Sequence, residues 1–311
     1  MEPSIDDVRA AAARIEPFVH RTPVCTSRSL DAWLGTRTFC KAEHLQRAGA
    51  FKFRGATNAV QLLSDDEAAR GVATHSSGNH GAALALAARE RGAEAFIIVP
   101  ANASPPKRAA IEAYGAHVIE CAPTLAAREA KLTEVVAETG AYVVHPYDDD
   151  RVIAGAGTAT LELLDAIDRL DVIVTPVGGG GLASGTCVAA HGIDPRIRVI
   201  GAEPTGADDA ARSLAAGHVV PQLAPDTVAD GLRTSLSERT FGVLSNHLER
   251  IVTVPDTATV AAMRFVWERM KFVIEPSAAV AVAAAREAGL DGDRVGIILS
   301  GGNVDLDALP W

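Results

Sequence analysis

The chain has 311 residues, and 29 Lys and Arg against 39 Asp and Glu give it a formal net charge of −10. A concentrated positive face is therefore not expected, which argues against nucleic acid or an anionic membrane surface as a partner. Hydrophobic residues at 48% and charged residues at 22% are ordinary for a compact protein, and the chain is long enough for two lobes that share a cleft.

The cysteines and the N-terminus indicate where the protein works. The four cysteines lie far apart without a CxxC pair, so the sequence predicts neither a zinc ribbon nor a disulfide framework. Residues 1–18 predict an amphipathic helix rather than a secretory signal, and no apolar run reaches membrane-spanning length. We expect a cytoplasmic protein with no membrane partner.

Short β-branched runs alternate with alanine-rich segments, which is the pattern of parallel strands joined by crossover helices. The predicted strands span residues 71–75, 94–99, 116–121, 141–145, 171–177, 197–203, 250–254 and 294–299. Their apolar character predicts burial on both faces, as in a doubly wound sheet. The predicted fold class is therefore α/β.

Proline and oxygen-bearing caps mark helix starts between these strands. One helix is expected after Ser104, which precedes two prolines, and another after Pro255. The compact run from 71 to 147 predicts a small lobe inserted into a large one made of residues 1–70 and 148–311. Open α/β sheets bind ligands at the carboxyl ends of their strands, so we expect the ligand between the lobes.

The most specific motif is AFKFRGA at residues 50–56, which contains Lys52. A lysine at the entrance to a helix, beside an aromatic residue, lies where burial and the helix N-terminal field both disfavour its charge. A neutral amine is a nucleophile that can form a Schiff base with an aldehyde cofactor. A surface lysine paired with a carboxylate is the alternative when the motif is taken alone.

The second motif, SSGNHG at residues 76–81, follows a predicted strand and opens an alanine-rich helix. Hydroxyls, an amide and free backbone N–H groups gather there, which predicts an anion site sized for a carboxylate. A simple capping turn is the alternative, but Asn79 and His80 add more polar groups than a cap requires.

The third motif, GGGGL at residues 178–182, ends another predicted strand and opens a helix. Glycines let the backbone approach a phosphate closely while successive amides donate to it. The motif is neither the dinucleotide GxGxxG pattern nor a P-loop, so a small phosphorylated ligand fits better than ATP. A mobile glycine loop is the alternative.

A serine, Ser300, follows the last predicted strand, where its hydroxyl could hydrogen-bond to a ring nitrogen. Alone, this residue would predict only a turn. Together with a reactive lysine, a carboxylate site and a phosphate-binding loop, it indicates an enzyme that uses pyridoxal 5′-phosphate (PLP).

The sequence resembles the serine racemase and serine/threonine dehydratase family, whose fold is shared with tryptophan synthase β-subunits. The motifs follow the family order nearly from end to end: AFKFRGATNAV, THSSGNHG, VIAGAGT, PVGGGGL, AEPTGADDAARS, TVADGL, VWERMK, IEPSAAVAVAA and LSGGNVDL. The resemblance implies a two-lobed fold with doubly wound parallel sheets, a homodimer and an amino-acid substrate.

The resemblance also implies roles for single residues. Lys52 would hold the cofactor and remove the α-proton, while Phe51 packs against the cofactor ring. The other implied cofactor contacts are Asn79 at the phenolic oxygen, Ser300 at the ring nitrogen, and Gly178, Gly179, Gly180, Gly181 and Leu182 at the phosphate. The implied substrate-binding residues are Ser76, Ser77, Gly78, His80 and Arg128. A serine at the ring nitrogen stabilises a carbanion less than an aspartate would, which favours elimination over transamination.

A site for Mg²⁺ or Ca²⁺ is implied at Glu203, Asp209 and the carbonyl of Ala207. Two carboxylates and a carbonyl on one turn suit a hard divalent cation. A solvated acidic helix start is the alternative. The ion would stabilise the large lobe rather than take part in the chemistry.

Some positions depart from the family pattern or carry no transferable role. Ala156 replaces a frequent glutamine, and Tyr147 stands where the racemase has asparagine, a change that could alter substrate choice. Glu275 lies near the cofactor by resemblance, and a structural hydrogen bond at a helix start is its expected role.

The residues that bind ATP in nucleotide-activated members are not transferable. A regulatory C-terminal domain is not expected, because the chain stops soon after Asp305.

The expected reaction is deamination of L-serine or L-threonine to ammonia and pyruvate or 2-oxobutanoate. One alternative is an amino-acid racemase with Lys52 and Ser77 on opposite faces of the α-carbon. Another is a dehydratase of a different β-hydroxy amino acid, such as 3-hydroxyaspartate or a phenylserine. A β-replacement synthase and a ligand-sensing protein without turnover are the remaining alternatives.

Overall fold

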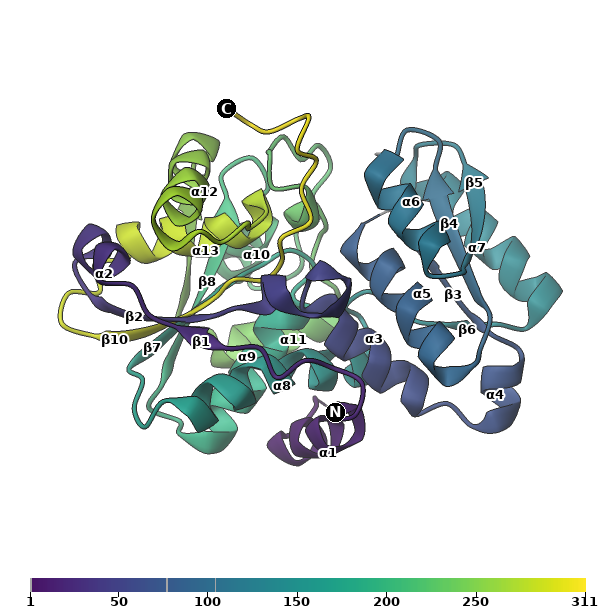
Figure 1. Ribbon diagram of the computed structural model, residues 1–311, viewed down its shortest axis with the longest axis horizontal. Coiled ribbons are helices and arrows are strands. Elements are labelled where there is room, and N and C mark those ends of the chain that lie inside the picture. The colour runs from purple at the N-terminus through teal and green to yellow at the C-terminus, as the bar shows by residue number, and fades with distance from the viewer. Residues whose placement is uncertain (1, 77, 104) are drawn as a thin grey trace.

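The computed structural model describes residues 2–76, 78–103 and 105–311. Figure 1 shows two sheets side by side, joined by helices between them. The strands are β1 Val24–Cys25, β2 Arg37–Lys41, β3 Val72–His75, β4 Ala95–Pro100, β5 His117–Cys121, β6 Tyr142–Val143, β7 Val172–Pro176, β8 Arg198–Pro204, β9 Arg250–Val254 and β10 Arg294–Ile298.

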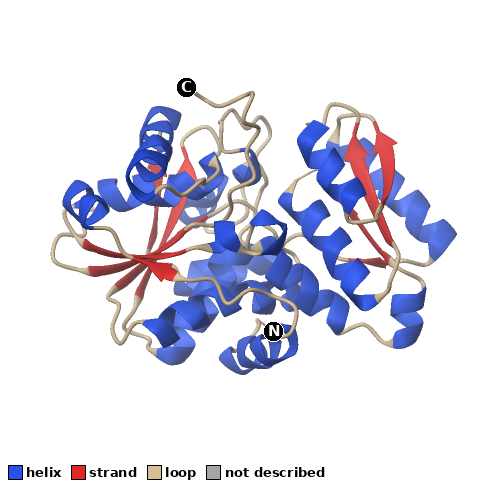
Figure 2. Ribbon diagram, in the orientation of Figure 1, coloured by secondary structure: helices blue, strands red, loops and turns tan. Residues whose placement is uncertain are grey.

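Helices cover both sheets, as Figure 2 shows. They are α1 Ile5–Ile15, α2 Arg28–Leu34, α3 Lys52–Gln61, α4 Asp65–Ala69, α5 Asn79–Arg91, α6 Pro105–Ala113, α7 Leu125–Thr139, α8 Asp150–Ala166, α9 Gly181–Ile193, α10 Asp209–Ala216, α11 Glu238–His247, α12 Asp256–Met270 and α13 Pro276–Glu287. Short 3₁₀ turns lie at Glu43–Leu45, Arg47–Gly49 and Asp230–Leu232. Among the described residues, no helix is both long and apolar enough to cross a membrane.

The larger sheet has six strands in the order β1-β2-β10-β7-β8-β9, with only β1 antiparallel to its neighbour. Alternate residues of β7 enter opposite cores. Val172 and Val174 pack with residues of α2, α12 and α13, whereas Ile173 packs with residues of α1, α8, α9 and α11. Helices therefore cover both faces, which confirms the predicted doubly wound α/β fold.

The smaller sheet has four parallel strands in the order β5-β4-β3-β6. Helices α5 and α6 lie on one face and α7 on the other (Figure 1). Its core also takes in Phe53, Ala56 and Val60 of α3, and α3 packs against both α5 and α8. Helix α3 thus connects the two sheets, and the lobe boundaries at residues 70/71 and 147/148 stay a prediction.

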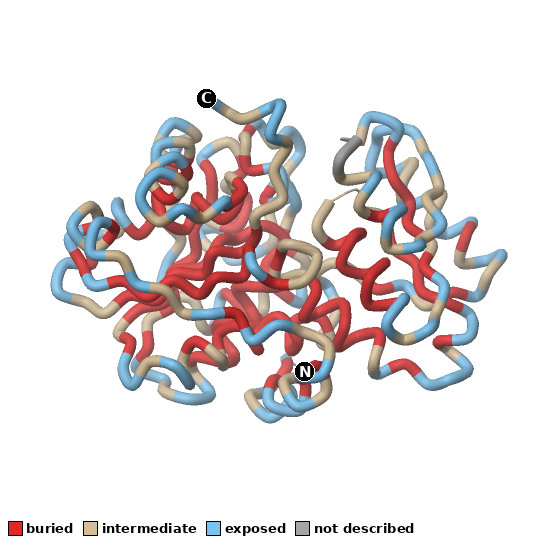
Figure 3. The backbone as a smooth tube through the Cα atoms, viewed as in Figure 1, coloured by how far each residue is buried: buried red, intermediate tan, exposed pale blue. Residues whose placement is uncertain are grey.

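Each predicted strand is present, but two features of the sheets differ from expectation. The sequence did not predict β1, which has two residues, or β2, in which Lys41 is fully buried. Burial on both faces is wrong for β5, β6 and β9, whose residues are mostly exposed or half-buried. All three are edge strands, so one side has no neighbour to cover it. Figure 3 shows the buried segments concentrated in the inner strands and the helix faces against them.

The predicted helix starts agree with the structure where it describes them. Helix α1 has a capping box at Ser4, and α12 begins at Asp256 with Pro255 in the N-cap position. Helix α6 begins at Pro105, while Ser104 lies outside the described residues. Strands β7 and β10 are parallel neighbours in the middle of the larger sheet. The glycine motif and Ser300, which follow these strands, therefore lie at the same end of the sheet, where both strands finish.

Candidate active site

Lys52 is the first residue of α3 and lies where that helix meets the end of β10. The backbone N–H of Phe51 donates to the carbonyl of Ser300 at 2.9 Å, which fixes the start of the helix. The Lys52 Nζ donates to the carbonyl of Pro146 at 2.7 Å and lies 5.1 Å from the centroid of the Phe51 ring. Burial lowers the pKa of Lys52 to about 8, although the charge of Glu275 acts in the opposite direction. A neutral amine is therefore accessible near neutral pH.

This lowered pKa predicts how the apoprotein captures PLP at different pH values. Only the neutral amine attacks an aldehyde, and its fraction falls about tenfold for each pH unit below the pKa. The rate of PLP incorporation, followed by absorbance after rapid mixing, should therefore rise with pH to about 8 and then level off. A rate that keeps rising to pH about 10 would show that Lys52 titrates like an ordinary lysine.

Asn79, the first residue of α5, is held by side chains from the segments that precede α13 and follow β10. Its Nδ2 donates to the two carboxylate oxygens of Glu275 at 2.8 and 3.1 Å, and its Oδ1 accepts from Asn303 Nδ2 at 2.9 Å. Glu275 precedes α13, but its side chain does not cap that helix. The structural hydrogen bond expected for Glu275 is present, but it is made to Asn79 at the start of α5 rather than to α13. Burial raises the pKa of Glu275 to about 7.

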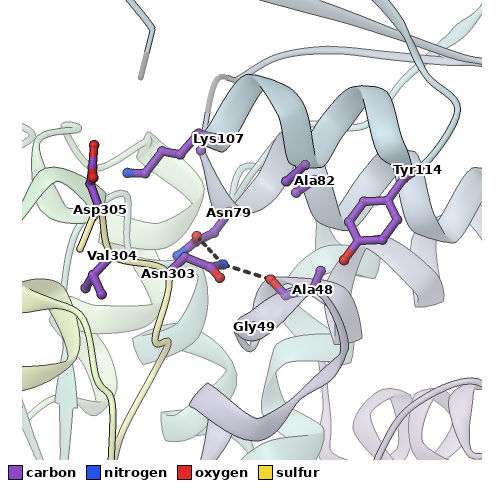
Figure 4. A pocket seen from close by; sticks show the side chains of 11 residues that line it. Ala48, Gly49, Asn79, Ala82, Lys107, Tyr114, Asn303, Val304 and Asp305 are labelled. Carbon is purple, nitrogen blue, oxygen red and sulfur yellow. Dashed lines mark hydrogen bonds between the residues drawn. The ribbon is translucent and has the colours of Figure 1, made fainter. Parts of the chain in front are cut away.

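A cavity of about 220 Å³ lies beside Asn79, between the starts of α5 and α6 and the segment after β10. Lys107, Tyr114 and Asn303 line it, and Figure 4 shows Asn303 hydrogen-bonded to both Asn79 and the carbonyl of Ala48. Lys107 and Tyr114 were not predicted as site residues, because each is a single polar residue without a spacing pattern. Asn303 lies within the LSGGNVDL motif, but no role was predicted for it, and the structure shows that it bonds the Asn79 side chain.

The glycine motif lies between β7 and the start of α9, as predicted. Gly180 has a left-handed φ of 87°, which favours glycine. A Cβ on Gly179 would overlap the ring of Tyr147, and one on Gly178 would lie 3.0 Å from the carbonyl of Gly231. The loop is thus closely covered, and its N–H groups at the start of α9 form the positive end of that helix dipole, which suits a phosphate.

Nitrogen atoms without partners gather near the ends of β3 and β6. His80 Nε2 donates to the carbonyl of Val144 at 3.0 Å, which leaves its Nδ1 as an acceptor. Within the part of the chain that the structure describes, His80 Nδ1, His75 Nδ1 and Arg128 Nε are buried and unpaired. Burial lowers the pKa of His80 to about 3, and the charges of Lys52, His145 and His75 add to this effect. Buried unpaired polar atoms of this kind indicate a place for a polar ligand.

The structure brings most of the predicted site residues together. Lys52, Phe51 and Ser300 meet directly, Asn79 is linked to Glu275, and Ser300 is 4% exposed. Ser76, Gly78 and His80 lie around the start of α5, and Arg128 lies near enough to His75 for its charge to lower the pKa of that ring. Ser77, the predicted second catalytic residue, lies outside the described residues.

The predicted metal-binding residues form a separate buried acidic group. Glu203 accepts from the backbone N–H groups of Ala210 and Ala211 at 3.1 and 2.8 Å, and burial raises its pKa to about 8. Burial also raises the pKa of Asp209 to about 6, and its Oδ1 has no partner among the described residues. No group of three His, Cys, Asp or Glu side chains in the described ranges could hold a metal. Both Glu203 oxygens and Asp209 Oδ2 accept from backbone N–H groups, so Asp209 Oδ1 is the oxygen of this pair that stays open to a cation.

The fold and the lysine-centred site define a cofactor-dependent enzyme, and the chain belongs to the family of pyridoxal-phosphate dependent enzymes, whose model matches residues 15–301. It is 47% identical over 311 residues to the beta-hydroxyaspartate dehydratase of Paracoccus denitrificans (strain Pd 1222), covering 99% of each chain. It is 46% identical over 312 residues to the serine racemase of Oryza sativa subsp. indica, covering 98% of this chain and 92% of the relative. Maize serine racemase superposes with a TM-score of 0.97 at 44% identity, covering 99% of this chain and 95% of that one. The predicted family, PLP dependence and fold are confirmed.

Proposed function

We propose that this protein is a PLP-dependent ammonia-lyase that eliminates the β-hydroxyl group of a hydroxy amino acid. The observation that carries the proposal is Lys52, whose amine has a pKa lowered to about 8 beside the Phe51 ring and the end of β10. The names of two relatives reported above, a beta-hydroxyaspartate dehydratase and a serine racemase, each contain a hydroxy amino acid. A lysine of this kind can serve both as cofactor anchor and as base.

The residues of this chain fit PLP. Lys52 would hold its aldehyde carbon, Asn79 its phenolic oxygen, Ser300 its ring nitrogen and the loop at 178–182 its phosphate. When bound, PLP is an electron sink that makes the α-proton of an amino acid acidic. The buried Glu275 fixes the Asn79 amide, so this contact is already oriented before the cofactor enters.

The remaining steps belong to protein side chains and water. The backbone N–H groups at the start of α5, with Ser76 and Gly78, would bind the α-carboxylate. Lys52 Nζ would take the α-proton, and the β-hydroxyl would leave with one proton as water, so the α-hydrogen and the β-hydroxyl together account for the water that is lost. The enamine that is released reacts with one water molecule and gives a keto acid and ammonia. The net reaction therefore splits the substrate into these two products.

Among hydroxy amino acids, we propose 3-hydroxyaspartate as the preferred substrate over L-serine and L-threonine. Arg128 has a buried, unpaired Nε and lies beside His75 at the end of β3, where a second carboxylate would find a positive charge. The similarity to a beta-hydroxyaspartate dehydratase supports this choice. The test is a panel of kcat/KM values for keto acid formation, in which 3-hydroxyaspartate should rank first. A higher value for L-serine or L-threonine would overturn the substrate choice.

Replacing Arg128 with leucine should show which of the two carboxylates of 3-hydroxyaspartate this residue binds. We expect kcat/KM for 3-hydroxyaspartate to fall about 10- to 100-fold, because a charged hydrogen-bond partner is lost. The value for L-serine, which has no second carboxylate, should change by less than about threefold. Lys131→Leu on the same helix is the control, since Lys131 pairs with Glu134 at the surface. An equal loss for both substrates would show that Arg128 binds the α-carboxylate instead.

Racemisation is the second candidate, favoured by the 46% identity to a serine racemase. It requires a proton donor on the face of the α-carbon opposite Lys52, and Ser77 is the candidate. The test is inversion of L-serine by the wild type and by Ser77→Ala. Inversion that survives this change would remove Ser77 from that role.

We also propose that Glu203, Asp209 and the Ala207 carbonyl bind Mg²⁺ or Ca²⁺. Two buried carboxylates with raised pKa values and one unpaired oxygen support this assignment. Mg²⁺ should raise the Tm of the wild type by about 2–5 °C, because it binds only the folded state. Asp209→Asn should abolish this rise, while Asp208→Asn, which removes a neighbouring carboxylate paired with Arg212, should keep it. An equal response in all three proteins would contradict the site.

A further inference from the structure

The ring of Tyr147 lies against the glycine loop of the large sheet. A Cβ built on Gly179 would overlap its Cγ, Cδ1 and Cε1 atoms, and one on Gly181 would lie 2.9 Å from the Tyr147 Cβ. Both glycines therefore leave room for this side chain. The loop needs glycine at 179 and 181 partly because Tyr147 covers it.

The segment that carries Tyr147 is fixed on both sides. The His145 ring meets the Tyr147 ring edge-on, with centroids 4.6 Å apart at 81°, and His145 Nδ1 accepts from the N–H of Asp148 at 2.8 Å. The carbonyl of Pro146 accepts from Lys52 Nζ at 2.7 Å. The segment thus links the reactive lysine to the glycine loop.

The surroundings of Tyr147 make its ring, rather than its hydroxyl, the part that contacts the loop. The loop meets the Cβ and the near ring carbons. Burial and the charges of Asp148, Asp209 and Glu129 raise the pKa of Tyr147 to about 12, so the hydroxyl stays neutral. A half-buried neutral ring packed against Gly179 and Gly181 keeps water from this side of the loop.

We propose that Tyr147 is a cofactor-retaining residue whose ring covers the glycine loop and shields the phosphate bound there from water. This inference rests on the proposed role of residues 178–182 as the phosphate site. Excluding water strengthens the hydrogen bonds between backbone N–H groups and a phosphate, because the local dielectric constant falls. Dissociation of the cofactor must then displace or bypass the ring, which slows it.

The experiment measures cofactor loss from the holoenzyme. Wild type, Tyr147→Ala, Tyr147→Phe and Tyr142→Ala are diluted into cofactor-free buffer and filtered at intervals through a membrane that retains the protein, and the cofactor absorbance of the filtrate gives the rate. Tyr142 is a half-buried tyrosine of β6 that stacks on Arg151 and serves as the matched control. Tyr147→Ala should lose the cofactor about tenfold faster than the wild type, since an aromatic contact is removed. Tyr147→Phe and Tyr142→Ala should stay within about twofold of the wild type.

Each outcome separates this inference from the proposed function. A wild-type rate for Tyr147→Ala would overturn the inference while leaving the function intact. Equal losses for Tyr147→Phe and Tyr147→Ala would also overturn it, because the hydroxyl would then be the retaining group. A wild type that binds no PLP at Lys52 would overturn the proposed function and the inference together. If Tyr147→Ala does not fold, Tyr147→Leu replaces it. Cofactor loss from Tyr147→Leu that is faster than from the wild type, but less than about tenfold faster, then supports retention by the ring.

Discussion

Replacing Lys52 with alanine is expected to lower kcat for keto acid formation by at least about 10³-fold. The change removes both the amine that would anchor the cofactor and the base that takes the α-proton. Arginine should not restore activity, because a guanidinium stays protonated and cannot attack an aldehyde. The structure supplies the reason that lysine works here: burial at the start of α3 lowers its pKa to about 8. Activity is measured as keto acid released from 3-hydroxyaspartate or L-serine by PLP-loaded protein.

The control for this prediction is Lys131→Ala, which removes a lysine that pairs with Glu134 on α7. Its kcat should equal that of the wild type. Borohydride reduction followed by peptide mass mapping should locate the cofactor on the peptide that contains Lys52. Retention of more than about a tenth of the wild-type kcat by Lys52→Ala would remove Lys52 from its catalytic role.

Arg54→Leu is expected to lower the free energy of unfolding by about 3–5 kcal/mol. Arg54 is fully buried two residues after Lys52, and its guanidinium contacts both Glu43 and Glu162 with N–O distances of 2.7 to 2.9 Å. Lys41, also fully buried, completes the group through Glu162. Removing Arg54 leaves the buried Glu43 and the partly buried Glu162 with Lys41 as their cation among the described residues, and this uncompensated charge accounts for the cost.

Denaturant unfolding of the PLP-loaded protein measures the effect. Arg9→Leu is the matched control, because Arg9 forms an exposed pair with Asp6 on α1 and should change stability by less than about 0.5 kcal/mol. The charged group joins α3 to β2 and α8, so Arg54→Leu should also loosen the start of α3. A loss below about 1 kcal/mol would show that the buried charges contribute little to holding this helix.

The parts of the fold that the sequence predicted are those with local signals. Apolar β-branched runs identified the strands from β3 to β10, and the proline and cap signals identified the starts of α6 and α12. Strand β2 gave no such signal, because its buried Lys41 is compatible with a strand interior only when Glu162 lies opposite, 121 residues away. The exposed edges β5 and β9 were also beyond local reasoning, since strand order is a property of the assembled sheet.

The same distinction holds for the site. The motif around Lys52 and the glycine loop are local, and the structure places both at the carboxyl ends of strands or the starts of helices as predicted. The partner of Asn79 was not predictable, because Glu275 lies 196 residues further along the chain. Tyr147 was noticed in the sequence only as a departure from the family, and its contact with Gly179 depends on the two sheets meeting.

The measurement that tests the central claim most directly follows ammonia, keto acid and the configuration of the remaining substrate in one incubation of PLP-loaded protein with 3-hydroxyaspartate. The proposed elimination predicts that ammonia and keto acid form in equal amounts while the remaining substrate keeps its configuration at the α-carbon. Inversion of that carbon faster than ammonia release would contradict it and make the protein a racemase with elimination as a side reaction.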